Sequence, residues 1–134
     1  MVTDSNGVVQ QALYDAFGIY LPLISTNCVI LGICLFLDVW TPDANPRARR
    51  AVMVYFHGGA YSTGSVTDAV NDGSVLAARG DVVVVTVNHR LNALGYLYLG
   101  DLHSDFAISG NAGTLDQVLA LQWVRDNVER FGGD

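Results

Sequence analysis

The chain alternates between stretches with strand-like and helix-like hydrophobic patterns. The apolar runs at residues 33–40 and 51–56 predict two strands, and the second leads directly into His57-Gly58-Gly59. Residues 81–87 read Asp-Val-Val-Val-Val-Thr-Val, and such a β-branched run without polar alternation predicts a strand buried on both faces, as in a parallel sheet. Between these strands, residues 72–80 predict a short helix with acid early, arginine late and a glycine stop.

A long helix is predicted over residues 113–131. Thr114-x-x-Gln117 is a candidate capping box, and Gly132-Gly133 supplies the stop. The side chains expected on its buried face are Leu115, Val118, Leu119, Gln122 and Trp123, followed by Val124, Val128 and Phe131. The order of elements predicts an α/β fold with a mostly parallel sheet, in which function concentrates in loops at the carboxyl ends of strands.

Composition narrows the class of protein. The 134 residues favour one domain, 1–134, and their hydrophobic share of 51% against 15% charged residues means that much of the surface needs covering. A net charge of -6, with no basic stripe among seven Lys and Arg residues, argues against binding to nucleic acid.

The amino-terminal part contains an uncharged run, residues 16–37, that has the length of a membrane span. Pro22, the polar residues 25–27 and the lack of flanking basic residues argue against a membrane span. The region that precedes this run lacks basic residues and so differs from a secretory signal peptide, and we expect a cytoplasmic protein. Cys28 and Cys34 have no companion ligands, so we predict free thiols, no metal site and no cofactor.

The residues after the second predicted strand, His57-Gly58-Gly59-Ala60, suggest acyl-transfer chemistry. Consecutive small residues let a substrate carbonyl approach exposed backbone N–H groups, which stabilise the oxyanion that forms in the reaction. The alternative interpretation is that the two glycines only make a tight turn.

Several blocks in a fixed order decide between these interpretations. They are residues 34–42, 52–61 (Val-Met-Val-Tyr-Phe-His-Gly-Gly-Ala-Tyr), 82–91, 95–97, and 110–134, which ends in Phe-Gly-Gly-Asp. From about residue 34 onward the chain resembles the type-B carboxylesterases, a family that includes cholinesterases, bacterial nitrobenzyl-ester hydrolases and the non-catalytic neuroligins. The resemblance implies an α/β-hydrolase fold, with Gly59 and Ala60 as oxyanion-hole donors, Gly58 at the turn and His57 as loop support.

The match to this family breaks at several positions. Its arginine after the buried strand is present as Arg90, but the acid that usually pairs with it is replaced by Gly32-Ile33, so Arg90 must find another acid, solvent or another chain. The histidines His57, His89 and His103 are each better explained as structural residues than as a catalytic base. The loop serines Ser62, Ser65, Ser104 and Ser109 lie outside any G-x-S-x-G elbow.

The resemblance therefore implies a partial α/β-hydrolase domain that stops before the nucleophile elbow, with no recognisable nucleophile and a divergent segment at residues 1–33. The leading hypothesis is a carboxylic-ester hydrolase for small, short-acyl esters; the alternatives are a non-catalytic binding or structural fragment, and half of a split esterase. Because covering elements would be missing, we expect self-association or a complementing chain.

Overall fold

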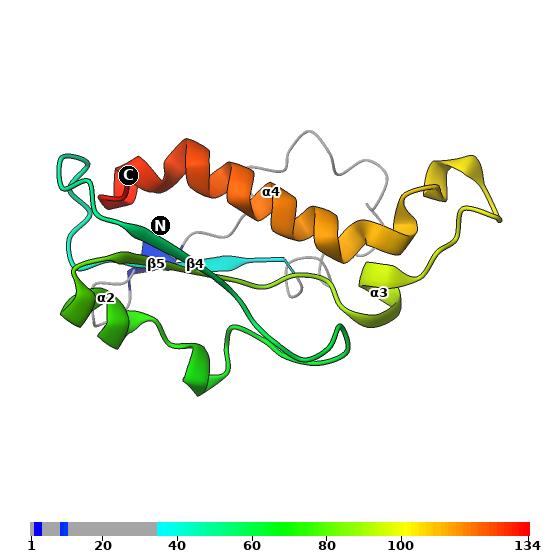
Figure 1. The fold of residues 1–134 in the computed structure, drawn as a ribbon, viewed down its shortest axis with the longest axis horizontal. Helices are drawn as coiled ribbons and strands as arrows, with labels where there is room; N and C mark the ends of the chain where they lie inside the picture. Colours follow the sequence, from blue (N-terminus) through cyan, green and yellow to red (C-terminus); the bar gives the residue numbers. More distant parts are fainter. Residues whose placement is uncertain (1, 4–8, 11–34) are drawn as a thin grey trace.

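The computed structural model of the chain describes residues 2–3, 9–10 and 35–134 (Figure 1). In this part, five strands form one sheet in the order β1-β2-β3-β5-β4. The strands are β1 (Val2–Thr3), β2 (Val9–Gln10), β3 (Leu37–Trp40), β4 (Val52–Phe56) and β5 (Val83–Val87). The three runs predicted as strands are therefore confirmed over their described residues.

The pairing of the strands differs from the expected mostly parallel sheet. Only β4 and β5 pair in parallel among the described strands, with Phe56 opposite Val87, whereas β3 runs antiparallel to β5. The pairs β1–β2 and β2–β3 are also antiparallel. An all-apolar run reports burial on both faces but not the direction of the neighbouring strands, and for this reason the pattern at 81–87 did not reveal the direction of β3.

Helices cover both faces of the sheet. The long helix α4 lies along one face and α2 on the other (Figure 1). The helical elements are η2 (Ala69–Asn71), α2 (Ser74–Gly80), α3 (Asn92–Tyr96), η3 (Ser104–Phe106), η4 (Ser109–Asn111), α4 (Ala112–Asn127) and η5 (Val128–Phe131), where η marks 3₁₀-helix. With α2 connecting the parallel strands β4 and β5, the architecture is of the α/β class.

The core sits between β5 and α4. Every residue of β5 is buried, which confirms the strand predicted to be covered on both faces. Trp123 and Phe131 pack into the same cluster with their ring centroids 6.0 Å apart. Burial of a single valine side chain contributes about 1.5–3 kcal/mol, so this central strand is the main hydrophobic support of the fold.

The long helix is confirmed, and Trp123, Val124, Val128 and Phe131 are buried as predicted. The first half of the predicted face and the predicted cap are wrong. Leu115 and Val118 are 42% and 45% exposed, and the buried positions are Gly113, Asp116, Ala120, Trp123 and Val124. Asn111 is the residue that precedes the helix and makes no side-chain cap bond, so Thr114 forms no capping box. The helix is turned by tight contacts at its start, since a Cβ on Gly113 would lie 2.4 Å from the Arg90 carbonyl oxygen.

Several sequence predictions concern residues outside the described part. Cys28 and Cys34, most of the uncharged run 16–37, and most of the divergent segment 1–33 belong to this group. Within the described residues, no helix combines the length and apolar character needed to cross a membrane.

Candidate functional site

The carboxyl ends of β4 and β5 meet at one edge of the sheet because these strands are parallel. His57 follows β4, and Asn88-His89-Arg90 follows β5. The rings of His57 and His89 stack with centroids 4.7 Å apart and planes 5° apart, and both residues are buried. The third histidine, His103, is exposed and caps η3 by accepting from the Asp105 N–H at 3.2 Å. The structure thus brings His57 and His89 together, next to the loop that follows His57.

The two buried histidines have different surroundings. The Nδ1 of His57 lies 2.9 Å from the Gly58 carbonyl oxygen, which can only accept, so Nδ1 carries the proton. His57 Nε2 is then a buried acceptor that receives no hydrogen bond from the described residues. Burial lowers the pKa of His89 below 6.5, a direction reinforced by His57 and opposed by its bond to the Arg90 carbonyl and by Asp116. His89 is therefore neutral at neutral pH.

The loop after His57 reverses direction at Gly59. The N–H groups of Ser62 and Thr63 both donate to the Gly59 carbonyl, at 3.0 and 3.1 Å. Gly59 has φ of 128°, and a Cβ there would lie 1.8 Å from the Thr63 oxygen, whereas a Cβ on Gly58 would meet nothing within 4 Å. The turn therefore depends on Gly59 and not on Gly58, which corrects the expectation.

The next two residues continue in a backbone region that side chains disfavour. Ala60 has φ of 53° and Tyr61 has φ of 66°. The N–H groups of Gly59 and Ala60 donate to no acceptor within the described part of the chain, and both residues are exposed. The two predicted donors thus have no hydrogen-bond acceptor among the described residues.

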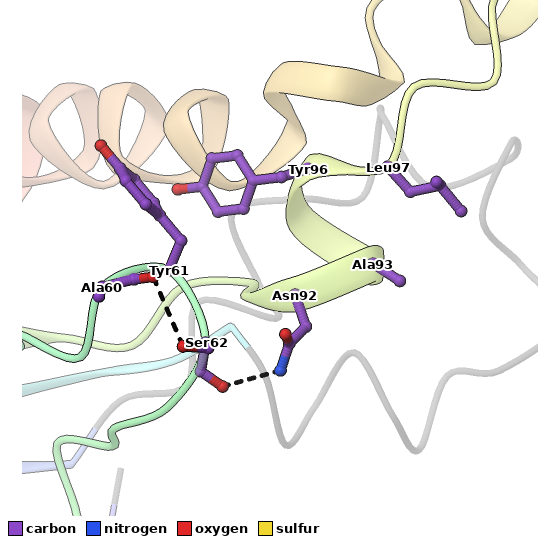
Figure 2. A pocket seen from close by; sticks show the side chains of 7 residues that line it. All are labelled: Ala60, Tyr61, Ser62, Asn92, Ala93, Tyr96 and Leu97. Atoms are coloured by element: carbon purple, nitrogen blue, oxygen red, sulfur yellow. Dashed lines mark hydrogen bonds between the residues drawn. The ribbon is translucent and has the colours of Figure 1, made fainter.

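Asn92, at the start of α3, contacts this loop twice. Its backbone N–H donates to the Tyr61 carbonyl at 2.8 Å. Its Nδ2 donates to the Ser62 carbonyl at 2.7 Å (Figure 2). Nothing in the hydrophobic pattern singles out Asn92. The available signal is residue type alone, because asparagine adopts left-handed backbone more readily than other side chains, and here its φ is 53°.

An open pocket of about 360 Å³ lies between the loop and α3. The rings of Tyr61 and Tyr96 meet edge to face across it, with centroids 4.8 Å apart (Figure 2). Its lining consists of Ala60, Tyr61, Ser62, Asn92, Ala93, Tyr96 and Leu97. The pocket borders one of the two free N–H donors and offers apolar and aromatic walls beside it.

The loop serines are engaged in local hydrogen bonds. Ser62 donates to the Gly59 carbonyl at 3.2 Å, Ser65 bonds to Thr67 at 2.8 Å, and Ser109 accepts from the Leu99 N–H at 2.7 Å. Ser104 opens η3 beside the exposed His103. Within the described residues, no group of three or more His, Cys, Asp or Glu side chains gathers in a way that could hold a metal ion.

Arg90 finds its acid on α4. Its Nε and Nη2 donate to the two carboxylate oxygens of Asp116 at 2.8 and 2.6 Å, and its backbone N–H donates at 3.0 Å. The Asp116 side chain is 3% exposed and that of Arg90 is 17% exposed. Of the three alternatives expected for Arg90, the structure shows another acid, and the ion pair fastens the end of β5 to α4.

The model of the Carboxylesterase family matches residues 33–134. A second model, described as an Rnf-Nqr subunit and membrane protein, matches the shorter stretch 7–53, most of which lies outside the described residues.

Individual relatives agree with the longer match. The para-nitrobenzyl esterase of Bacillus subtilis is 48% identical over 101 residues, and human carboxylesterase 3 is 52% identical over 102 residues; each alignment covers 75% of this chain. It covers 20% and 17% of those relatives, so the chain spans about a fifth of their length.

Solved structures show the same relationship. An esterase from Clostridium hathewayi, whose title describes hydrolysis of aliphatic aromatic polyesters, superimposes with a TM-score of 0.73 at 51% identity, covering 75% of this chain and 20% of that one. A carboxylesterase of Geobacillus stearothermophilus gives 0.72 at 48% identity, covering 75% and 22%. The shared sequence and the shared α/β-hydrolase architecture lead to one conclusion: the chain belongs to the carboxylesterase family.

Proposed function

We propose that this chain supplies the carbonyl-polarising part of a carboxylic-ester hydrolase for short acyl esters, with the N–H groups of Gly59 and Ala60 as the donors. One observation carries the proposal: Gly59 and Ala60 are exposed residues at the carboxyl end of a strand, and their N–H groups donate to nothing in the described residues. The carbonyl oxygen of an ester gains negative charge in the transition state, and one such donor contributes about 3 kcal/mol to stabilising it.

The nucleophile is assigned to groups outside these 134 residues. No serine of the chain lies in a G-x-S-x-G sequence, and the hydroxyls of Ser62 and Ser65 bond within their own loop. A family relationship to serine esterases then leaves this chain the oxyanion-binding role, with His57 supporting the loop. The pocket beside Ala60, walled by Tyr61 and Tyr96, is the proposed place for the substituents of a small ester.

The test compares Gly59→Ala with Gly58→Ala as a matched control. The structure provides room for a methyl group at Gly58 and none at Gly59. Sodium butyrate, the acid product of a butyrate ester, is titrated into ¹⁵N-labelled protein. We expect the amide resonances of Gly59 and Ala60 to move in the wild type and in Gly58→Ala, and not to move in Gly59→Ala. Once a chain that carries the nucleophile is added, hydrolysis of p-nitrophenyl butyrate is expected to follow the same order, with a loss of about 10²-fold for Gly59→Ala.

Equal butyrate responses in all three proteins would remove the oxyanion-loop assignment. Circular dichroism of Gly59→Ala shows whether the sheet and α4 persist, which separates a local loss from unfolding. If the amides of Gly59 and Ala60 ignore butyrate in the wild type as well, the proposal fails outright.

A second candidate is a non-catalytic binding module. The serine hydroxyls of the loop are held by neighbouring oxygens, and this favours binding without covalent chemistry. This candidate predicts no labelling by a fluorophosphonate probe, and stoichiometric labelling of one serine would exclude it.

The proposal also includes self-association, or covering by a complementing chain. On β4, the edge strand of the described sheet, Met53 and Tyr55 are 48% and 44% exposed. The outer face of α4 exposes Leu115, Val118 and Leu121 to a similar degree. Apolar side chains grouped on a strand edge and a helix face are typical of surfaces that bind another protein segment.

A further inference from the structure

We propose that Asn92 is a positioning residue, which holds residues 59–62 in the conformation that leaves the Gly59 and Ala60 N–H groups free. Its catalytic purpose rests on the proposed function. The inference begins with the loop backbone, because Ala60 and Tyr61 both have positive φ. Residues with a Cβ remain in that region only where their surroundings hold them there.

Asn92 provides the holding contacts. The carbonyls of Tyr61 and Ser62 are consecutive acceptors, and both receive hydrogen bonds from this one residue, at 2.8 and 2.7 Å. Fixing two successive carbonyls fixes the peptide planes between them, and with them the direction of the preceding backbone (Figure 2). The clamp therefore acts on the segment immediately after the two free donors.

The clamp is attached to a rigid part of the fold. Asn92 opens α3, and Gly95 of this helix sits so close to Arg90 that a Cβ would lie 2.5 Å from the Arg90 carbonyl oxygen. Arg90 is in turn held on α4 by Asp116. The loop is thus held at its start by β4 and farther along by α3, which is itself packed on Arg90.

Asparagine suits this position better than glycine, alanine or aspartate. The residue has φ of 53°, which glycine and asparagine tolerate and alanine resists. Glycine would keep the backbone bond to Tyr61 and lose the amide that reaches Ser62. Aspartate would place an acceptor against the Ser62 carbonyl and repel it. Asn92→Gly therefore isolates the side-chain bond without straining the backbone.

The experiment uses the full chain and pairs Asn92→Gly with Asn71→Gly. Asn71 is a matched control because its Nδ2 makes the same kind of bond, 2.7 Å to the Ser65 carbonyl, farther along the same loop. Amide hydrogen exchange is measured for Ser62 and Thr63, whose N–H groups close the turn on Gly59. Loss of one hydrogen bond predicts exchange about fivefold faster in Asn92→Gly, with no change in Asn71→Gly.

A second readout separates positioning from general stability. Butyrate binding, followed at the Gly59 and Ala60 amides, is expected to weaken by about fivefold in Asn92→Gly while the exchange of β5 amides stays unchanged. Unchanged exchange at Ser62 and Thr63 would overturn the inference, and so would an equal acceleration across β5. If the wild type ignores butyrate but the turn amides respond to Asn92→Gly as expected, the positioning role is supported and the proposed function is the part that fails.

Discussion

The ion pair between Arg90 and Asp116 offers the most direct test of how the site is held on the fold. Asp116→Asn keeps the size of the side chain and removes its charge. The carboxylate accepts three hydrogen bonds from Arg90, at 2.6, 2.8 and 3.0 Å. An amide has one oxygen to accept with and places an NH₂ group against the guanidinium, so the variant loses both charge and hydrogen-bond geometry.

The burial of the pair sets the size of the effect. The Asp116 side chain is 3% exposed and the Arg90 side chain 17% exposed, so water replaces little of what is lost. Breaking a buried ion pair from one side costs about 3–5 kcal/mol, and we expect about 3 kcal/mol because asparagine retains part of the bonding. With a urea slope of about 1.5 kcal/mol per molar, the unfolding midpoint falls by about 2 M.

The control lies on the same helix. Arg125 and Asp126 form an ion pair of 2.7 Å whose side chains are 73% and 57% exposed. Asp126→Asn is expected to leave the urea midpoint, followed by circular dichroism, unchanged within error, because solvent screens an exposed pair. Equal shifts in the two variants would refute the reasoning from burial. A double variant, Arg90→Met with Asp116→Leu, should lose less stability than Asp116→Asn alone, since no charge is left behind.

Two further predictions concern pH and assembly. Because burial lowers the pKa of His89, the unfolded chain binds a proton more readily than the folded one. The stability from neutral His89 is present above pH 6.5 and is lost as pH falls from 6.5 through the lowered pKa of the folded state. Urea midpoints should show this slope in the wild type and a smaller one in His89→Gln. Sedimentation at micromolar concentration should show species larger than a monomer. The double variant Leu115→Lys, Leu121→Lys should dissociate them, whereas Val70→Lys, at a position that is 88% exposed, should leave them intact. A monomeric wild type would contradict this prediction.

The parts of the fold that the sequence predicted well are those with strong local signals. The β-branched run at 81–87 and the glycines after residue 56 restrict the backbone whatever surrounds them, and they became β5 and the loop after β4. The order of blocks along the chain then identified the family, because a fixed series of motifs is far more specific than one motif.

The predictions that failed depend on contacts between distant residues. The first half of helix α4 carries apolar side chains on more than one side, including Leu115, Val118 and Leu121, so periodicity selected the buried face correctly only in the second half. In that half, the ion pair with Arg90 places Asp116 on the buried side of the helix. In the same way, the turn at Gly59 and the clamp by Asn92 depend on the backbone of residues 62 and 63, which no local pattern reveals.

These contacts bear on whether oxyanion binding is separable from the nucleophile in this family domain. At the start of the loop, His57 follows β4 and packs on His89, which follows the parallel strand β5. Farther along the loop, Asn92 fixes the Tyr61 and Ser62 carbonyls from α3. Every one of these supports comes from the described residues themselves. A loop that is held on both sides by its own chain needs no nucleophile elbow for its support, so we expect the proposed donors to bind an anionic oxygen before any nucleophile is supplied.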